Sequence, residues 1–184
     1  MGKDILVLTG SPRKGGNSDK LADAFIKGAN HSGHDTVKFE AAFKNIQGCK
    51  GCGLCFSGSH PCVIRDDFDE LYPLLERSGV IAFFSPLYWG GISAQLKAAW
   101  DRFHAYTGRE NRKRLAIRES VYVLCGHNDN TAQYEPAAKI YRDIAAYMGW
   151  QDRGVLLAAG LLDKTGIDGR PAELAKAEAL GASL

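Results

Sequence analysis

Short strand-like segments alternate with stretches of helical spacing along the 184-residue chain. Val80 to Ser85 (VIAFFS) is a continuous apolar run, which is typical of a strand buried on both faces of a sheet. Four other segments also fit strands. The predicted strands are residues 4–9, 35–40, 80–85, 120–125 and 155–159.

Between the strands, apolar residues recur at helical spacing. In the first such stretch, which starts at Asp19, the apolar face is formed by Leu21, Ala24, Phe25 and Ala29, and Asn17 or Ser18 can cap the start of the helix. The other predicted helices are 68–77, 93–106, 131–148 and 171–180. Strands alternating with helices predict an α/β fold, in which helices cover both faces of a parallel sheet.

Composition supports one soluble domain over residues 1–184, because hydrophobic residues make up 45% of the chain. The net charge is only +2, so nothing indicates a nucleic-acid partner. The N-terminal apolar run, Ile5 to Leu8, is too short for a signal peptide. No run approaches the ~18 apolar residues of a membrane span. We therefore expect a cytoplasmic protein that does not associate with membranes.

The loop after the first strand, Gly10 to Ser18, has the chemistry of a phosphate site. Its glycines allow close backbone approach, and the start of the following helix favours an anion. The spacing fits neither a Walker loop nor a dinucleotide fingerprint. The alternative is a plain turn with a capping residue. The predicted phosphate ligands are Ser11, Arg13, Asn17 and Ser18.

Two further loops follow predicted strands. In Ser85 to Gly91, Tyr88 and Trp89 can line a flat ring system, or they can simply cover the end of the sheet. In the loop that starts at Gly126, small residues permit close contact with a ring, and His127 either donates to a ligand or is a solvated loop histidine. If the strand order is 2-1-3-4-5, all three loops meet at one sheet edge, where open α/β sheets bind ligands.

Four of the five cysteines form the pattern C-x2-C-x2-C-x6-C within a glycine-rich segment at about residues 46–66. Two consecutive two-residue gaps bring three thiolates to one side of a tight loop, which suits a [4Fe–4S] cluster. A structural zinc usually takes two separated pairs. Cysteines that bind no metal are the remaining alternative. The candidate ligands are Cys49, Cys52, Cys55 and Cys62.

Two charged stretches have simpler interpretations. Lys97, Asp101 and Arg102 fit ion pairs at a helix or subunit surface better than catalytic roles. The basic run Arg109 to Arg118 fits a solvated surface connection, or a site that attracts the phosphate of a pyridine nucleotide.

Together, these motifs resemble the NADPH-dependent FMN reductase branch of the flavodoxin-like superfamily. The resemblance covers residues 4–130 and rests on three motifs: Gly-Ser-Pro-Arg-x3-Asn-Ser, Ser-Pro-Leu-Tyr-Trp-Gly-Gly and Leu-Lys-x3-Asp-Arg. The cysteine motif, followed by Val63 to Asp67, resembles the iron–sulfur flavoproteins of that branch. The last fifty residues match only in outline.

The resemblance implies a flavodoxin-like three-layer fold with non-covalently bound FMN, and a homodimer or homotetramer. It places the phosphate on the first loop, as above. The implied ring-binding residues are Pro86, Leu87, Tyr88, Trp89 and Gly90 on one side, and Gly126 and His127 on the other.

We therefore expect an enzyme that uses FMN to move electrons from NAD(P)H or a reduced carrier to a quinone, a flavin or another acceptor. Hydride transfer requires no acid–base residue, so no catalytic residue is predicted. The alternative is an electron-transfer carrier with a [4Fe–4S] cluster. A signalling module on the same fold needs an acidic pocket, and the first strand ends instead in Thr9-Gly10-Ser11.

Overall fold

The computed structural model describes residues 2–57, 60–107 and 115–184. Its five-stranded sheet has the order β2-β1-β3-β4-β5, and all four pairings are parallel. The predicted strand order is therefore confirmed. The strands are β1 Asp4–Thr9, β2 Asp35–Glu40, β3 Val80–Pro86, β4 Glu119–Cys125 and β5 Gln151–Ala158.

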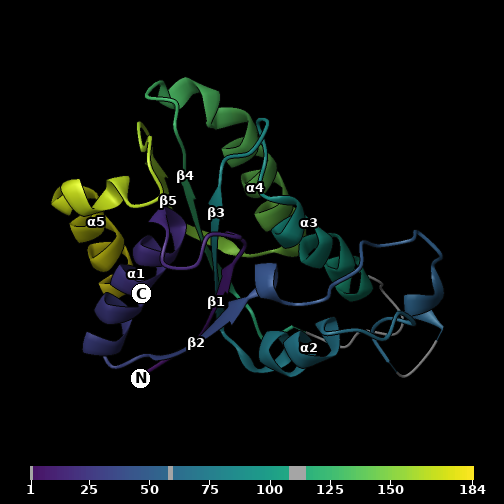
Figure 1. Cartoon of the computed structure of the whole chain (residues 1–184). Coiled ribbons are helices and arrows are strands. Elements are labelled where there is room, and N and C mark those ends of the chain that lie inside the picture. The colour runs from purple at the N-terminus through teal and green to yellow at the C-terminus, as the bar shows by residue number, and fades with distance from the viewer. Residues whose placement is uncertain (1, 58–59, 108–114) are drawn as a thin grey trace.

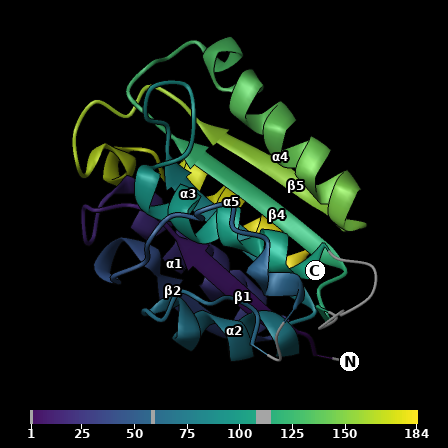
Figure 2. The same ribbon diagram turned by 90° about the vertical axis from the view of Figure 1, so that its right-hand side faces the viewer.

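The helices form a layer on each face of the sheet, as the alternating pattern predicts. In Figure 1, α1 and α5 lie on one side of the sheet, and α2, α3 and α4 lie on the other. The view in Figure 2 shows α3 in front of the strands and α5 behind them. The helices are α1 Asn17–His31, α2 Phe68–Arg77, α3 Ala94–Asp101, α4 Glu135–Met148 and α5 Pro171–Ala182.

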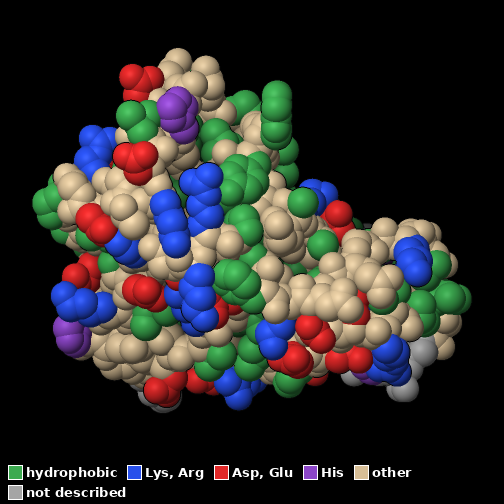
Figure 3. Space-filling model, viewed as in Figure 1, with side chains coloured by type: hydrophobic (Ala, Val, Ile, Leu, Met, Phe, Trp, Pro, Cys, Tyr) green, Lys and Arg blue, Asp and Glu red, His purple; other side chains and the backbone are tan. Residues whose placement is uncertain are grey.

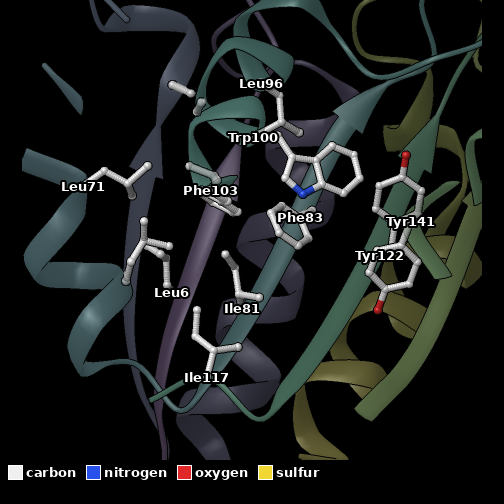
Figure 4. Packing of buried hydrophobic residues seen from close by; sticks show 14 of the residues in the cluster. Leu6, Leu71, Ile81, Phe83, Leu96, Trp100, Phe103, Ile117, Tyr122 and Tyr141 are labelled. Atoms are coloured by element: carbon white, nitrogen blue, oxygen red, sulfur yellow. The ribbon is translucent and has the colours of Figure 1, made fainter. Parts of the chain in front are cut away.

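Two hydrophobic cores fill the space between these layers. The larger core lies under α2, α3 and α4, where Phe83 of β3 contacts Trp100 of α3 with ring centroids 5.2 Å apart. Tyr122 and Tyr141 stack with their ring planes 4° apart (Figure 4). The smaller core lies under α1 and α5 and contains Phe25. The central strands are thus apolar on both faces, which explains the continuous run of β3.

Several element boundaries differ from the predicted ones. Ser93 is the N-cap of α3, and its Oγ accepts a hydrogen bond from Leu96 N. The α-helix ends at Asp101, and 3-10 turns continue to Tyr106. A separate 3-10 turn precedes α4. Strand β5 begins at Gln151 because edge strands tolerate the polar residues that look like a loop in sequence.

The predicted surface connection at residues 107–118 is only partly described. Residues 109–114 of the basic run lie outside the described part of the structure. At its far end, Leu115 and Ile117 are buried in the larger core, so this end is not a solvated surface. No helix among the described residues is long and apolar enough to cross a membrane.

Helices α1 and α5 approach so closely that only glycine fits between them. A β carbon on Gly28 would lie 1.9 Å from Glu178 O, and one on Gly181 would lie 2.1 Å from Phe25 O. We expect Gly28→Ala to lower the free energy of unfolding by about 1–3 kcal/mol, despite the better helix propensity of alanine. Urea unfolding measures this, with Gly169→Ala as the control, because a β carbon there meets nothing within 4 Å. Equal stability of the two variants would contradict the prediction.

Candidate functional site

A pocket of about 260 Å³ opens at the carboxyl edge of the sheet, where the loops after β1, β3, β4 and β5 meet. Nine of the predicted cofactor-binding residues line it: Ser11, Arg13, Asn17, Ser18, Pro86, Leu87, Tyr88, Gly126 and His127. Four other lining residues were not predicted from the sequence, namely Cys125, Leu161, Leu162 and Lys164. Three of these come from the loop after β5, where no motif marks them.

The start of α1 offers unused backbone donors to this pocket. Its N-cap is Gly16, so the prediction that Asn17 or Ser18 caps the helix is wrong. Gly16 has no side chain, and no side-chain hydrogen bond caps the helix. Asp19, in the first turn, instead accepts a hydrogen bond from Gly15 N. The first N–H groups of α1 therefore remain available to an anion.

The side chain of Asn17 connects the loop after β1 to the loop after β5 by two hydrogen bonds. Its Nδ2 donates to Asp163 O at 2.7 Å, and its Oδ1 accepts from Ile167 N at 3.0 Å. This holds the loop after β5 against the loop after β1. Lys164 thereby lines the same pocket as Arg13. Figure 3 shows Lys and Arg side chains on the face where the loop after β1 lies.

Below the pocket, Ser18 meets the end of β4. Its Oγ lies 3.1 Å from the sulfur of Cys125, which is buried. Burial raises the pKa of the Cys125 thiol to about 11, although the hydrogen bond with Ser18 opposes this. The thiol is therefore neutral at physiological pH, and it adds no negative charge beneath an anion site.

The loop after β3 is tied to its neighbours by hydrogen bonds. Leu87 N donates to Cys125 O at 2.7 Å, and Ser93 Oγ donates to Gly10 O at 2.6 Å. The backbones of Tyr88 and Gly91 hydrogen-bond to each other, which makes a tight turn. These bonds fix the second loop against both the first and the third.

Trp89, at the tip of this turn, does not line the pocket. Its side chain is fully exposed, and its φ of 47° is the only positive value among the described non-glycine residues. Gly90, with a φ of 79°, does not line the pocket either. A contact between these two residues and a cofactor therefore stays a prediction.

The loop after β4 requires glycine at its first position. A β carbon on Gly126 would lie 2.8 Å from the hydroxyl of Tyr134 and 3.3 Å from Cβ of Leu87. The Tyr134 hydroxyl donates to Asn128 O at 2.8 Å, which holds the loop in place. The backbone therefore passes close to the pocket, as the small residues in the sequence predict.

The four predicted metal ligands share a second pocket, of about 100 Å³. It is lined by Cys49, Lys50, Gly51, Cys52, Gly53, Cys55, Cys62, Ile64, Arg102, His104 and Ala105. Within the described ranges, no group of three or more His, Cys, Asp or Glu is already arranged at metal-binding positions. The donor set still fits a thiolate-ligated metal group, since four cysteines and no carboxylate line the pocket.

A buried ion pair holds together the two ends of the cysteine loop, which spans residues 48–62. We call these two ends, residues 45–47 and 64–67, the neck of the loop. Asp66 pairs with Arg102 of the 3-10 turn after α3, and each side chain is only 1% exposed. Asp66 also accepts from Gln47 N at 2.9 Å, and Asp67 accepts from Asn45 N at 2.7 Å. Beyond this neck the described residues 48–57 project from the body of the fold (Figure 1).

The Leu-Lys-x3-Asp-Arg motif thus supplies two different ion pairs. Lys97 and Asp101 form the surface pair that the sequence predicts, 2.6 Å apart and half exposed. The prediction of a surface role is wrong for Arg102, which is 2% exposed. Its charge is stabilised by Asp66, which lies 36 positions before Arg102 and carries no sequence signal for this pairing.

Known proteins resemble this chain in sequence and in fold. An iron–sulfur flavoprotein of Archaeoglobus fulgidus is 41% identical over 128 residues, which are 69% of this chain and 58% of the relative. One of Methanosarcina thermophila is 38% identical over 117 residues, covering 64% of this chain and 59% of the relative. The chain therefore matches less than two thirds of the length of these relatives.

Solved structures share the fold at low identity. An NAD(P)H:quinone oxidoreductase from Methanothermobacter marburgensis superposes with a TM-score of 0.78 at 18% identity, over 100% of this chain and 97% of the other. The sequence model of one family, described as NADPH-dependent FMN reductase, matches residues 4–147. These residues include the loops after β1, β3 and β4 and all four clustered cysteines. The chain belongs to the NADPH-dependent FMN reductase family.

Proposed function

We propose that this protein is an FMN-dependent oxidoreductase that takes electrons from NAD(P)H or a reduced carrier and passes them to a small-molecule acceptor or redox partner. The observation that carries the proposal is the pocket at the carboxyl edge of the sheet. It joins an uncapped helix start, which suits a phosphate, to a wall of apolar side chains and the ring of Tyr88, which suits a flat ring.

The lining residues divide into two groups. Ser11, Arg13, Lys164 and the first N–H groups of α1 would hold the phosphate. Leu87 and Tyr88 would contact one side of the ring system, and Gly126 and His127 the other. When bound, the flavin supplies the redox chemistry, and the protein binds and orients it.

A backbone N–H of the loop after β4 would stabilise negative charge on the reduced ring. Gly126 N already donates to Ala158 O at 3.2 Å, so this role falls to the next residues, His127 and Asn128. The neutral thiol of Cys125 adds no charge that would oppose it.

The test is to purify the full chain without oxygen, record its absorbance spectrum and identify any released flavin. We expect FMN at about one per chain, with bleaching of the flavin bands when NADH or NADPH is added. Protein without flavin that takes up none from added FMN would refute the proposal.

A second candidate function is electron transfer through an iron–sulfur cluster. The observation that favours it is the pocket shared by Cys49, Cys52, Cys55 and Cys62. Two relatives that match this chain are named iron–sulfur flavoproteins. The same preparation should then contain about four irons and four acid-labile sulfides per chain. Flavin without iron would leave only the oxidoreductase role.

A further inference from the structure

Arg102 is held on several sides by the core and the neck of the cysteine loop. Nη1 donates to both carboxylate oxygens of Asp66, at 2.6 and 2.7 Å. Nη2 donates to Ile64 O at 2.9 Å and to the hydroxyl of Tyr72 at 3.4 Å. The guanidinium carbon lies 4.3 Å from the ring centroid of Phe68. The orientation of this side chain is therefore fixed.

One nitrogen of this guanidinium group, Nε, is buried and has no acceptor for its hydrogen among the described residues. A buried donor without an acceptor costs about 1–3 kcal/mol, and more when it belongs to a charged group. Such a cost, at a residue fixed so firmly, indicates that an acceptor is missing.

The place for that acceptor is the cysteine pocket, because Arg102 lines it together with the four cysteines. The other charged residue of the lining is Lys50, and no Asp or Glu takes part. An iron–sulfur cluster held by four thiolates carries net negative charge, which increases when the cluster accepts an electron. Hydrogen bonds to its sulfurs are among the factors that set its reduction potential.

We propose that Arg102 donates its Nε–H to a sulfur of the cluster bound in this pocket and thereby raises the reduction potential of the cluster. The proposal rests on the iron–sulfur role proposed above. Arg102 is a positioning residue here. It forms no bond to iron and exchanges no electron. The donated hydrogen bond favours the reduced cluster, because that form carries more negative charge on its sulfurs.

The experiment is a redox titration of the iron-loaded full chain, with the reduced cluster followed by electron paramagnetic resonance. We expect Arg102→Lys, which keeps a positive charge but lacks Nε–H, to shift the midpoint potential of the cluster to a more negative value. The control is Arg118→Lys, because Arg118 donates to Leu115 O and Ile117 O and does not line the pocket. Its potential should equal that of the wild type.

A second variant separates hydrogen bonding from mere support of the loop. Asp66→Asn removes the charge that offsets Arg102 and leaves Nε–H in place, so we expect its potential to become more positive. A purely supporting role predicts no shift, or shifts in the same direction, for both variants, and either result would overturn the proposal. If Arg102→Lys does not accumulate as folded protein, Asp66→Asn still tests the proposal, because an unchanged or more negative potential in that variant would overturn it.

The iron and flavin content of the wild-type protein distinguishes a failure of this inference from a failure of the proposed function. Wild-type protein with FMN but without iron would overturn the role of Arg102 and leave the oxidoreductase standing. Iron without flavin would refute the oxidoreductase, and the titration of the cluster would still decide the role of Arg102.

Discussion

Asp66→Asn is expected to lower the free energy of unfolding by about 3 kcal/mol or more, because removing one partner leaves a buried guanidinium without its counter-charge. The pair is only 1% exposed on each side, so water cannot replace the lost carboxylate. Asp66 also accepts from Gln47 N and Phe68 N, and these bonds would weaken too. Urea unfolding of the metal-free chain measures the effect.

The matched control is Asp101→Asn. Asp101 pairs with Lys97 at the same distance of 2.6 Å, but both side chains are about half exposed. An exposed pair four residues apart on a helix contributes about 0.3–0.5 kcal/mol. Similar losses of stability in the two variants would show that the buried pair does not hold the neck of the cysteine loop.

The effect of Asp66→Asn should also depend on pH. Burial opposes the charge of Asp66, but hydrogen bonds from Arg102, Gln47 N and Phe68 N outweigh it and hold the pKa of this carboxyl below its usual value. A carboxyl group whose pKa is lower in the folded than in the unfolded state stabilises the fold. The full stabilisation is present when the pH is above the unfolded-state pKa of about 3.9, and it is lost as the pH falls through the folded-state pKa. The stability difference between wild type and variant should therefore shrink below about pH 4.

Arg13→Ala is expected to weaken FMN binding by about 10- to 150-fold, the equivalent of a lost hydrogen bond from a charged donor, worth about 1.5–3 kcal/mol. Arg13 lines the pocket beside the uncapped start of α1, where the phosphate would lie. Fluorescence quenching on titration of flavin-free protein with FMN measures the dissociation constant. Riboflavin, which lacks the phosphate, should bind both proteins equally.

The adjacent Lys14 provides the control. It carries the same charge in the same loop, but it does not line the pocket, and its ammonium lies 5.7 Å from the ring centroid of Phe43. Lys14→Ala should therefore change the FMN dissociation constant only through long-range attraction, which salt screens. Equal losses for Arg13→Ala and Lys14→Ala would indicate general electrostatic attraction, and no specific contact with the phosphate.

Periodicity and buried runs were sufficient to predict alternating strands and helices around a parallel sheet. The strand order came from the resemblance to the flavodoxin-like family, and with that order the three loops meet at one edge of the sheet. Ser11, Arg13, Leu87 and Gly126 line the pocket for this reason. The sequence pattern could not show how individual side chains are used. Asn17, which is predicted as a phosphate ligand and lines the pocket, also holds a loop 146 positions away.

Contacts across long sequence separations account for the other differences. Lys164 lines the pocket on the loop after β5, which Asn17 holds, and Cys125 lines it because β4 ends there. The sequence predicts a surface role for Arg102, because its pairing with the distant Asp66 is visible only in the structure. Such pairings carry no periodic signal, so they require the three-dimensional structure.

The closed neck of the cysteine loop has a consequence for how this fold can change over time. Asp66, Asp67 and Arg102 hold the two ends of the loop together. The entropic cost of a loop with fixed ends grows only slowly with its length. We therefore expect insertions, deletions or a change of metal ligands between residues 48 and 62 to leave the sheet and the pocket at its carboxyl edge intact.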